Sequence, residues 1–146
     1  GAFLFVVGSI LDILDGALAR AGGKTTPFGA FLDSTTDRVG EAAMLGAIAL
    51  IFHRYDHPVA LALAFAGVAG SLLVSYTRAR AEALGLKGDV GIGSRAERVV
   101  VITAGLVLAP ISIWLLVAAI SLLTATAWIT VLQRILFVRK QLAEKT

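Results

Sequence analysis

The sequence predicts an all-α integral membrane protein: a bundle of transmembrane helices that forms a single domain over residues 1–146. Hydrophobic residues make up 58% of the chain and charged residues 16%, well below the usual quarter. Mean hydropathy is +0.86. A soluble globule of this length could not bury so much apolar surface, whereas lipid can cover it. Five apolar stretches approach the length that crosses a membrane, about 20 residues.

These stretches cover residues 1–21, 28–52, 59–81, 92–108 and 111–138. Gly22-Gly23 with Lys24, a polar turn at 53–58, a glycine-rich loop at 85–93 and Pro110 separate them. The chain opens without Met inside an apolar run and shows no basic segment or cleavage site of a signal peptide. We therefore expect residues before Gly1 to be missing from the chain.

Basic side chains gather on one side of the predicted bundle. Following the chain through its turns places these residues on or near that side: Arg20, Lys24, Arg38, Arg78, Arg80, Lys87, Arg95, Arg98, Arg134, Arg139, Lys140 and Lys145. Arg54 alone falls on the other side. By the positive-inside rule the crowded side is cytoplasmic, which predicts a multi-pass protein of the cell membrane (inner or plasma). Such a face suits anionic lipid headgroups or a phosphorylated substrate. It lacks the interleaved aromatic residues of a nucleic-acid site.

Four aspartates stand inside the first two apolar stretches. Asp12 and Asp15 are spaced i, i+3, and Gly29, Asp33 and Asp37 follow one another at i, i+4 and i+8, so each set shares one helix face. Thr26 suits an N-cap and Pro27 the first helical position. An antiparallel hairpin about residues 22–26 brings all four carboxylates together, roughly 10–20 Å below the turn.

Burial of four unpaired anions is prohibitive, so the hairpin predicts a bound cation. Oxygen ligands favour Mg²⁺, Mn²⁺ or Ca²⁺, and the chain has no cysteine to form a thiolate site. The alternative is that each aspartate pairs with an arginine or faces water. It suits one aspartate better than four that converge at one depth. A divalent-cation carrier would also explain the aspartates, although the apolar run 42–52 offers it no polar path to the far side.

The residues between the aspartates complete a known pattern. Asp12-x-x-Asp15-Gly16-x-x-Ala19-Arg20, then eight residues, then Gly29-x-x-x-Asp33-x-x-x-Asp37 resembles the signature of the CDP-alcohol phosphotransferases, with all eight specified positions filled. The resemblance implies a six-helix membrane fold, usually a homodimer, whose first helix would be the missing one. It also implies the reaction: an alcohol attacks the lipid-bearing phosphate of a CDP-linked lipid, and CMP leaves.

The same resemblance implies roles for these residues. Asp12, Asp15 and Asp33 would bind metal, Mg²⁺ or Mn²⁺ and two ions in all, while Asp37 would be a shared ligand and the general base. Gly16, Ala19, Arg20 and Gly29 would bind the CDP-lipid. Small residues let a nucleotide approach the helix backbone, although they also allow tight helix packing. Arg20 could pair with a phosphate or extend to the membrane surface.

Further basic residues favour an acceptor that carries its own phosphate. Arg78 and Arg80 end one stretch, Arg95 and Arg98 open the next, and Arg134 lies deeper than an interface anchor requires. The alternative is that they only satisfy the positive-inside bias. Two local ion pairs are also expected, Arg78 with Glu82 and Arg38 with Glu41.

The segments 75–86, 88–101 and 132–142 resemble the actinobacterial phosphatidylinositol phosphate synthases, a branch of the same family. That likeness implies CDP-diacylglycerol as donor and inositol phosphate as acceptor. The phosphate-binding positions would be Arg78, Arg98 and Arg134, with Arg80 and Arg95 next to them. The rival acceptor within the family is glycerol 3-phosphate, as in phosphatidylglycerophosphate synthases.

Overall fold

The structure, a computed structural model, describes residues 26–92 and 95–144. Four helices account for most of these residues: α2 (Pro27–Arg54), α3 (Pro58–Ala83), α4 (Arg95–Leu108) and α5 (Ile113–Ala143). Each corresponds to one predicted apolar stretch, and the described part contains no strand, so the all-α fold is confirmed. The first predicted stretch, 1–21, lies outside the described residues.

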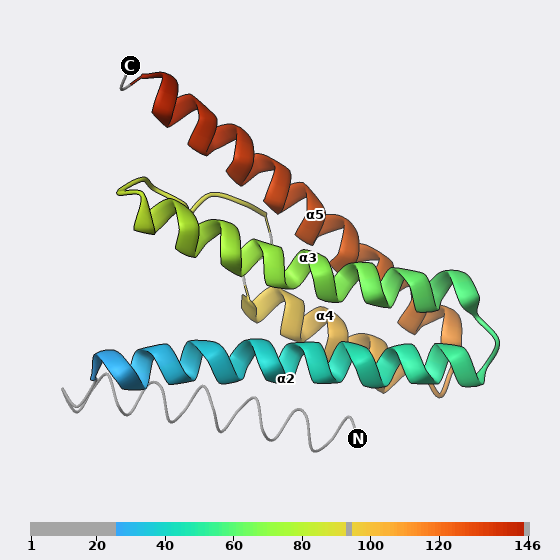
Figure 1. Ribbon diagram of the computed structural model, residues 1–146. Helices are drawn as coiled ribbons and strands as arrows, with labels where there is room; N and C mark the ends of the chain where they lie inside the picture. Colours follow the sequence, from blue (N-terminus) through green and yellow to red (C-terminus); the bar gives the residue numbers. More distant parts are fainter. Residues whose placement is uncertain (1–25, 93–94, 145–146) are drawn as a thin grey trace.

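Successive helices run in opposite directions (Figure 1). The start of α2, the end of α3, the start of α4 and the end of α5 therefore point toward one end of the bundle. This end carries most of the basic residues, which agrees with the sidedness expected from the sequence. The turn at 55–57 and the turn at 109–112 lie at the opposite end.

Local sequence signals set the helix starts. Thr26 has an extended backbone and its hydroxyl accepts a hydrogen bond from the Gly29 amide at 3.0 Å, while Pro27 occupies the first turn. This N-cap is the one expected from the sequence. Ser112 caps α5 in the same way, by accepting from the Trp114 amide at 3.3 Å.

The apolar core lies in the half of the bundle remote from the basic end. Leu45, Ile48 and Phe52 of α2 pack there with Leu116 and Ile120 of α5, and all five side chains are at most 1% exposed. By contrast, none of the described residues from 26 to 44 is buried. The part of α2 that carries Asp33 and Asp37 therefore stands outside this core.

Small residues and side-chain hydrogen bonds join α3 to α5. A Cβ atom on Gly67 would lie 2.9 Å from the Thr124 hydroxyl oxygen, so the backbone of α3 approaches α5 closely. Thr124 donates to the Leu63 carbonyl at 3.0 Å, and the Trp128 indole N–H donates to the Ala66 carbonyl at 3.1 Å. Contacts of this kind replace the hydrophobic driving force that helices lack inside lipid.

Among the described helices, α3 and α5 are long and apolar enough to cross a membrane. α4 has 14 residues, which is about 21 Å of helix and less than the roughly 30 Å of a bilayer core. Its start also falls later than the sequence predicted, because residues 86–92 form an extended loop. The count of five transmembrane helices therefore stays a prediction.

Candidate active site

Helix α2 carries the second half of the aspartate motif on one continuous face. Gly29, Asp33 and Asp37 are spaced by one turn each, and Glu41 follows one turn later on the same side. Asp33 is exposed and Asp37 is half-buried in the described part of the structure. Asp12, Asp15, Gly16, Ala19 and Arg20 lie outside the described residues, so the four-carboxylate hairpin stays a prediction.

The carboxylates that the structure does describe fit one half of an oxygen-donor metal site. Asp33 and Asp37 lie about 6 Å apart along the helix axis, on the side that a second helix would have to face. Within residues 26–92 and 95–144, no group of three or more possible ligands forms a metal site by itself. The sequence predicts Asp12 and Asp15 as the remaining ligands.

Glu41 has a different partner from the one that the sequence suggested. Its Oε1 lies 3.1 Å from Nε of Arg98, and its Oε2 lies 3.4 Å from Nη2 of the same side chain. The predicted pair between Glu41 and Arg38 is therefore wrong. The physical reason is direction: Arg38 faces the side of α2 next to α3 and contacts the Ser34 carbonyl, whereas Glu41 faces α4.

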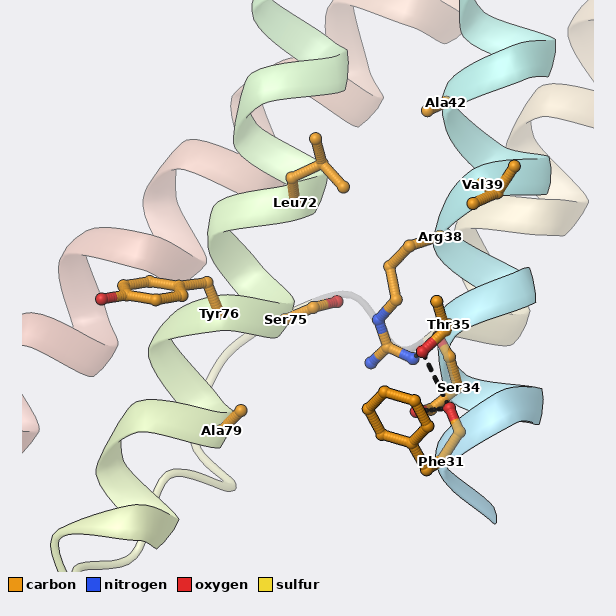
Figure 2. Close-up of a pocket in the computed structure, with 10 residues that line it drawn as sticks. All are labelled: Phe31, Ser34, Thr35, Arg38, Val39, Ala42, Leu72, Ser75, Tyr76 and Ala79. Carbon is orange, nitrogen blue, oxygen red and sulfur yellow. Dashed lines mark hydrogen bonds between the residues drawn. The ribbon is translucent and has the colours of Figure 1, made fainter. Parts of the chain in front are cut away.

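Arg38 instead enters a pocket between α2 and α3 (Figure 2). The pocket has a volume of about 610 Å³, and Figure 2 shows the Arg38 side chain between the two helices, near Thr35 and Ser75. Neither Asp33 nor Asp37 lines it. At 100° per residue, the lining positions of α2 lie on the side opposite the aspartates, so this pocket is separate from the candidate metal site.

The expected pair at the end of α3 is confirmed. Nε of Arg78 lies 2.9 Å from Oε1 of Glu82, and both side chains are more than half exposed. An exposed pair of this kind contributes little to stability, so Arg78 can exchange Glu82 for another anion at low cost. Arg80 is exposed nearby, while the side chain of Arg95 lies outside the described set.

Arg134 of α5 is buried against α3 and the loop that follows α3. It is 9% exposed, its Nε donates to the Val90 carbonyl at 2.8 Å, and its Nη1 donates to the Val74 carbonyl. The positive charges of Arg78 and Arg98 act on its guanidinium, as do the negative charges of Glu82 and Asp89. The structure thus brings Arg78, Arg98 and Arg134 into one electrostatic neighbourhood at the basic end.

Two further residues of α5, not identified from the sequence, act together with Arg134. Thr130 donates to the Ile92 carbonyl at 2.5 Å. The Gln141 side chain accepts from the Lys87 amide at 3.0 Å and donates to the Lys87 carbonyl at 2.8 Å. Their positions, i, i+4 and i+11 with Arg134, fall on one helix face. This polar stripe on an apolar helix is the signal that could have revealed them. It fastens the loop 84–92 to α5.

Comparison with known proteins gives a consistent result. Residues 1–139 match the family model described as CDP-alcohol phosphatidyltransferase. The archaetidylinositol phosphate synthase of Methanothermobacter thermautotrophicus is 40% identical over 97% of this chain and 71% of its own length.

Two crystal structures of the phosphatidylinositol phosphate synthase of Mycobacterium tuberculosis share the fold. The one with CDP-DAG bound has a TM-score of 0.84 and 34% identity, over 94% of this chain and 72% of that chain. The one in complex with manganese and citrate has a TM-score of 0.86 and 33% identity, over 94% and 68%. The family expected from the aspartate pattern is confirmed: this chain belongs to the CDP-alcohol phosphatidyltransferases.

Proposed function

We propose that this enzyme transfers a phosphatidyl group from CDP-diacylglycerol to a hydroxyl of inositol phosphate, giving phosphatidylinositol phosphate and CMP. The observation that carries the proposal is the cluster of Arg78, Arg98 and Arg134: Arg98 pairs with Glu41, one turn from Asp37, and the charges of Arg78 and Arg98 act on Arg134. Arg78 and Arg98 already pair with Glu82 and Glu41, but the Arg78 pair is exposed and weak, so an anion that contacts these arginines could replace Glu82. A phosphate on the acceptor would supply that anion.

The names of the relatives support the same acceptor. One is an archaetidylinositol phosphate synthase and another a phosphatidylinositol phosphate synthase. The lipid part of these names differs, but inositol phosphate is common to both. Glycerol 3-phosphate, the rival acceptor, also carries a phosphate and could use the same arginines. A cation carrier would need neither the arginines nor the nucleotide-binding pattern around the aspartates.

In the proposed reaction, the acceptor hydroxyl oxygen bonds to the lipid-bearing phosphorus. The bond from that phosphorus to the bridging oxygen then breaks, and CMP leaves with the bond's electron pair. Asp37 takes the proton of the hydroxyl. Asp12, Asp15, Asp33 and Asp37 would hold two divalent ions, Mg²⁺ or Mn²⁺, and these would neutralise the two phosphates of the donor. Gly16, Ala19, Arg20 and Gly29 would bind the CDP-lipid.

Asp37 suits the role of base for a geometric reason. At 1.5 Å per residue it stands about 16 Å along α2 from Thr26, on the same face as Asp33 and next to the turn that bears Glu41. An alcohol whose phosphate lies beside Arg98, the partner of Glu41, would therefore present its hydroxyl toward this part of α2. The half-buried position of Asp37 also limits the access of water.

The setting that we propose is a single domain of five transmembrane helices in this chain, one of two copies in a homodimer of the cell membrane. Two observations support it: α3 and α5 are apolar enough to span a bilayer, and most basic residues lie near the helix ends that meet at one end of the bundle. With the positive-inside rule, the active site would face the cytoplasm, where soluble inositol phosphate would reach it.

The test is an acceptor panel with purified protein, Mg²⁺ and CDP-diacylglycerol, in which CMP release is measured. We expect release with inositol 1-phosphate or inositol 3-phosphate, little with free inositol, and none after chelation of the metal. Preference for glycerol 3-phosphate would assign the rival acceptor. Equal use of free and phosphorylated inositol would contradict the role of the arginines.

A further inference from the structure

The ion pair between Glu41 and Arg98 joins two helices whose backbones stay apart, although Ile102 of α4 shares the apolar core with α2. In the described part of the chain, no Cα of α2 comes within 8 Å of a Cα of α4, although each helix packs closely on another neighbour. The two side chains span this gap, with exposures of 10% for Arg98 and 18% for Glu41. At the level of Glu41, outside the apolar core, these two side chains connect α2 to α4.

The ion pair is not well suited to a purely stabilising role. Removing two charges from water costs about as much as their attraction returns. Its Oε1 and Nε atoms are fully buried and approach to 3.1 Å without the alignment of a hydrogen bond. Loss of one partner would nevertheless leave the other charge buried and uncompensated. The pair thus fixes where the Arg98 guanidinium lies more than it strengthens the fold.

The contact with Glu41 uses one edge of the Arg98 guanidinium. Nε and Nη2, which form one edge of the planar group, are the atoms that face Glu41. A guanidinium has five N–H donors, and those of the other edge point away from the carboxylate. Phosphate oxygens are preferred partners for such a pair of donors.

We propose that Glu41 is a positioning residue for the acceptor phosphate. It holds Arg98 of α4 at a set distance from Asp37 of α2. The phosphate of the acceptor, at Arg98, and its reacting hydroxyl, at Asp37, are then both positioned relative to α2. Glu41 lies one turn, about 6 Å along the axis, from Asp37. This role rests on the proposed function, because it requires that the acceptor carry a phosphate.

The test is a set of Michaelis constants for two substrates. Glu41→Gln keeps the size of the side chain but removes its charge, so Arg98 should leave its position. We expect the KM for inositol phosphate to rise about tenfold or more and the KM for CDP-diacylglycerol to stay within about twofold; Glu41→Asp should restore part of the loss. The matched control is Glu144→Gln, which removes a carboxylate from an exposed pair with Lys140 and should change neither constant.

A double variant separates positioning from general damage. If Glu41 acts through Arg98, Glu41→Gln should add no further rise in acceptor KM to a protein that already carries Arg98→Gln. Additive effects, an equal rise in both KM values, or an unchanged acceptor KM would overturn the role of Glu41. A wild-type protein that releases no CMP with inositol phosphate would instead contradict the proposed function itself, and the inference would fall with it.

Discussion

At the scale of single residues, Asp37 should be the most sensitive described position in the enzyme. Asp37→Asn keeps the shape of the side chain but cannot accept the proton, and general base catalysis typically contributes about 10²–10⁴ in rate. We therefore expect kcat for CMP release to fall at least about 100-fold. The control is Ser34→Ala, since Ser34 lines the pocket on the other side of α2 and should retain activity. Full activity of Asp37→Asn would contradict the proposed role of Asp37 as general base.

Substitution of Arg134 should have two separable effects, because its side chain carries a charge and also donates hydrogen bonds to two backbone carbonyls. Its hydrogen bonds to the Val74 and Val90 carbonyls tie α3 and the following loop to α5. Loss of a buried hydrogen-bond partner costs about 1–3 kcal/mol, so Arg134→Ala should lower the melting temperature and also raise the acceptor KM more than the donor KM.

Arg134→Lys separates the two effects, since lysine keeps the charge but cannot donate to both carbonyls with the geometry of a guanidinium. It should lose stability as Arg134→Ala does, with a smaller rise in acceptor KM. Arg139→Ala, an exposed change on the same helix, is the control for both measurements. If Arg134→Lys matched wild type in melting temperature, the two hydrogen bonds of the guanidinium would have no structural role.

At the scale of elements, the loop 84–92 should depend on Gly91. Its φ is +137°, and a Cβ atom there would lie 2.3 Å from Cγ2 of Thr130. Backbone strain of this kind costs about 1–3 kcal/mol, and the clash would also push the loop from α5. Gly91→Ala should therefore lower the melting temperature clearly. Gly85→Ala is matched to it, with φ +69° but open space around the added atom, and should lose less. Equal losses would show that strain alone matters.

The four described helices could be predicted from apolar runs and breaks, because membrane length and the N-cap at Thr26 are local properties of the chain. Their ends were less certain: α5 continues past the apolar run to Ala143, since a helix need not end where the bilayer does. The partner of Glu41 could not be predicted, because Arg98 is 57 positions away and Arg38 offered an equally good local choice. The carbonyl partners of Arg134 could not be predicted either, because every residue has a backbone carbonyl and the sequence does not indicate which of them accept.

At the scale of the whole molecule, the larger apolar core and the candidate active site lie toward opposite ends. The apolar core around Phe52 and Leu116 lies near the turns at 55–57 and 109–112, whereas the arginines and Asp37 lie toward the other end. Substitutions in the core should therefore change the melting temperature with little effect on KM. This separation lets polar groups gather at one end of the bundle without disturbing the larger apolar core.

The orientation of the molecule in the membrane gives a direct test of this arrangement. The chain contains no cysteine, so single cysteines can be introduced without a background. Tyr55→Cys lies at an exposed position in the turn after α2, and Lys87→Cys in the loop after α3, at the basic end. In intact cells, a membrane-impermeant maleimide should label Tyr55→Cys, while Lys87→Cys should react only after the membrane is opened. The reverse pattern would place the arginines and Asp37 outside the cell, away from cytoplasmic inositol phosphate. Labelling of both from outside would contradict a membrane-spanning α3.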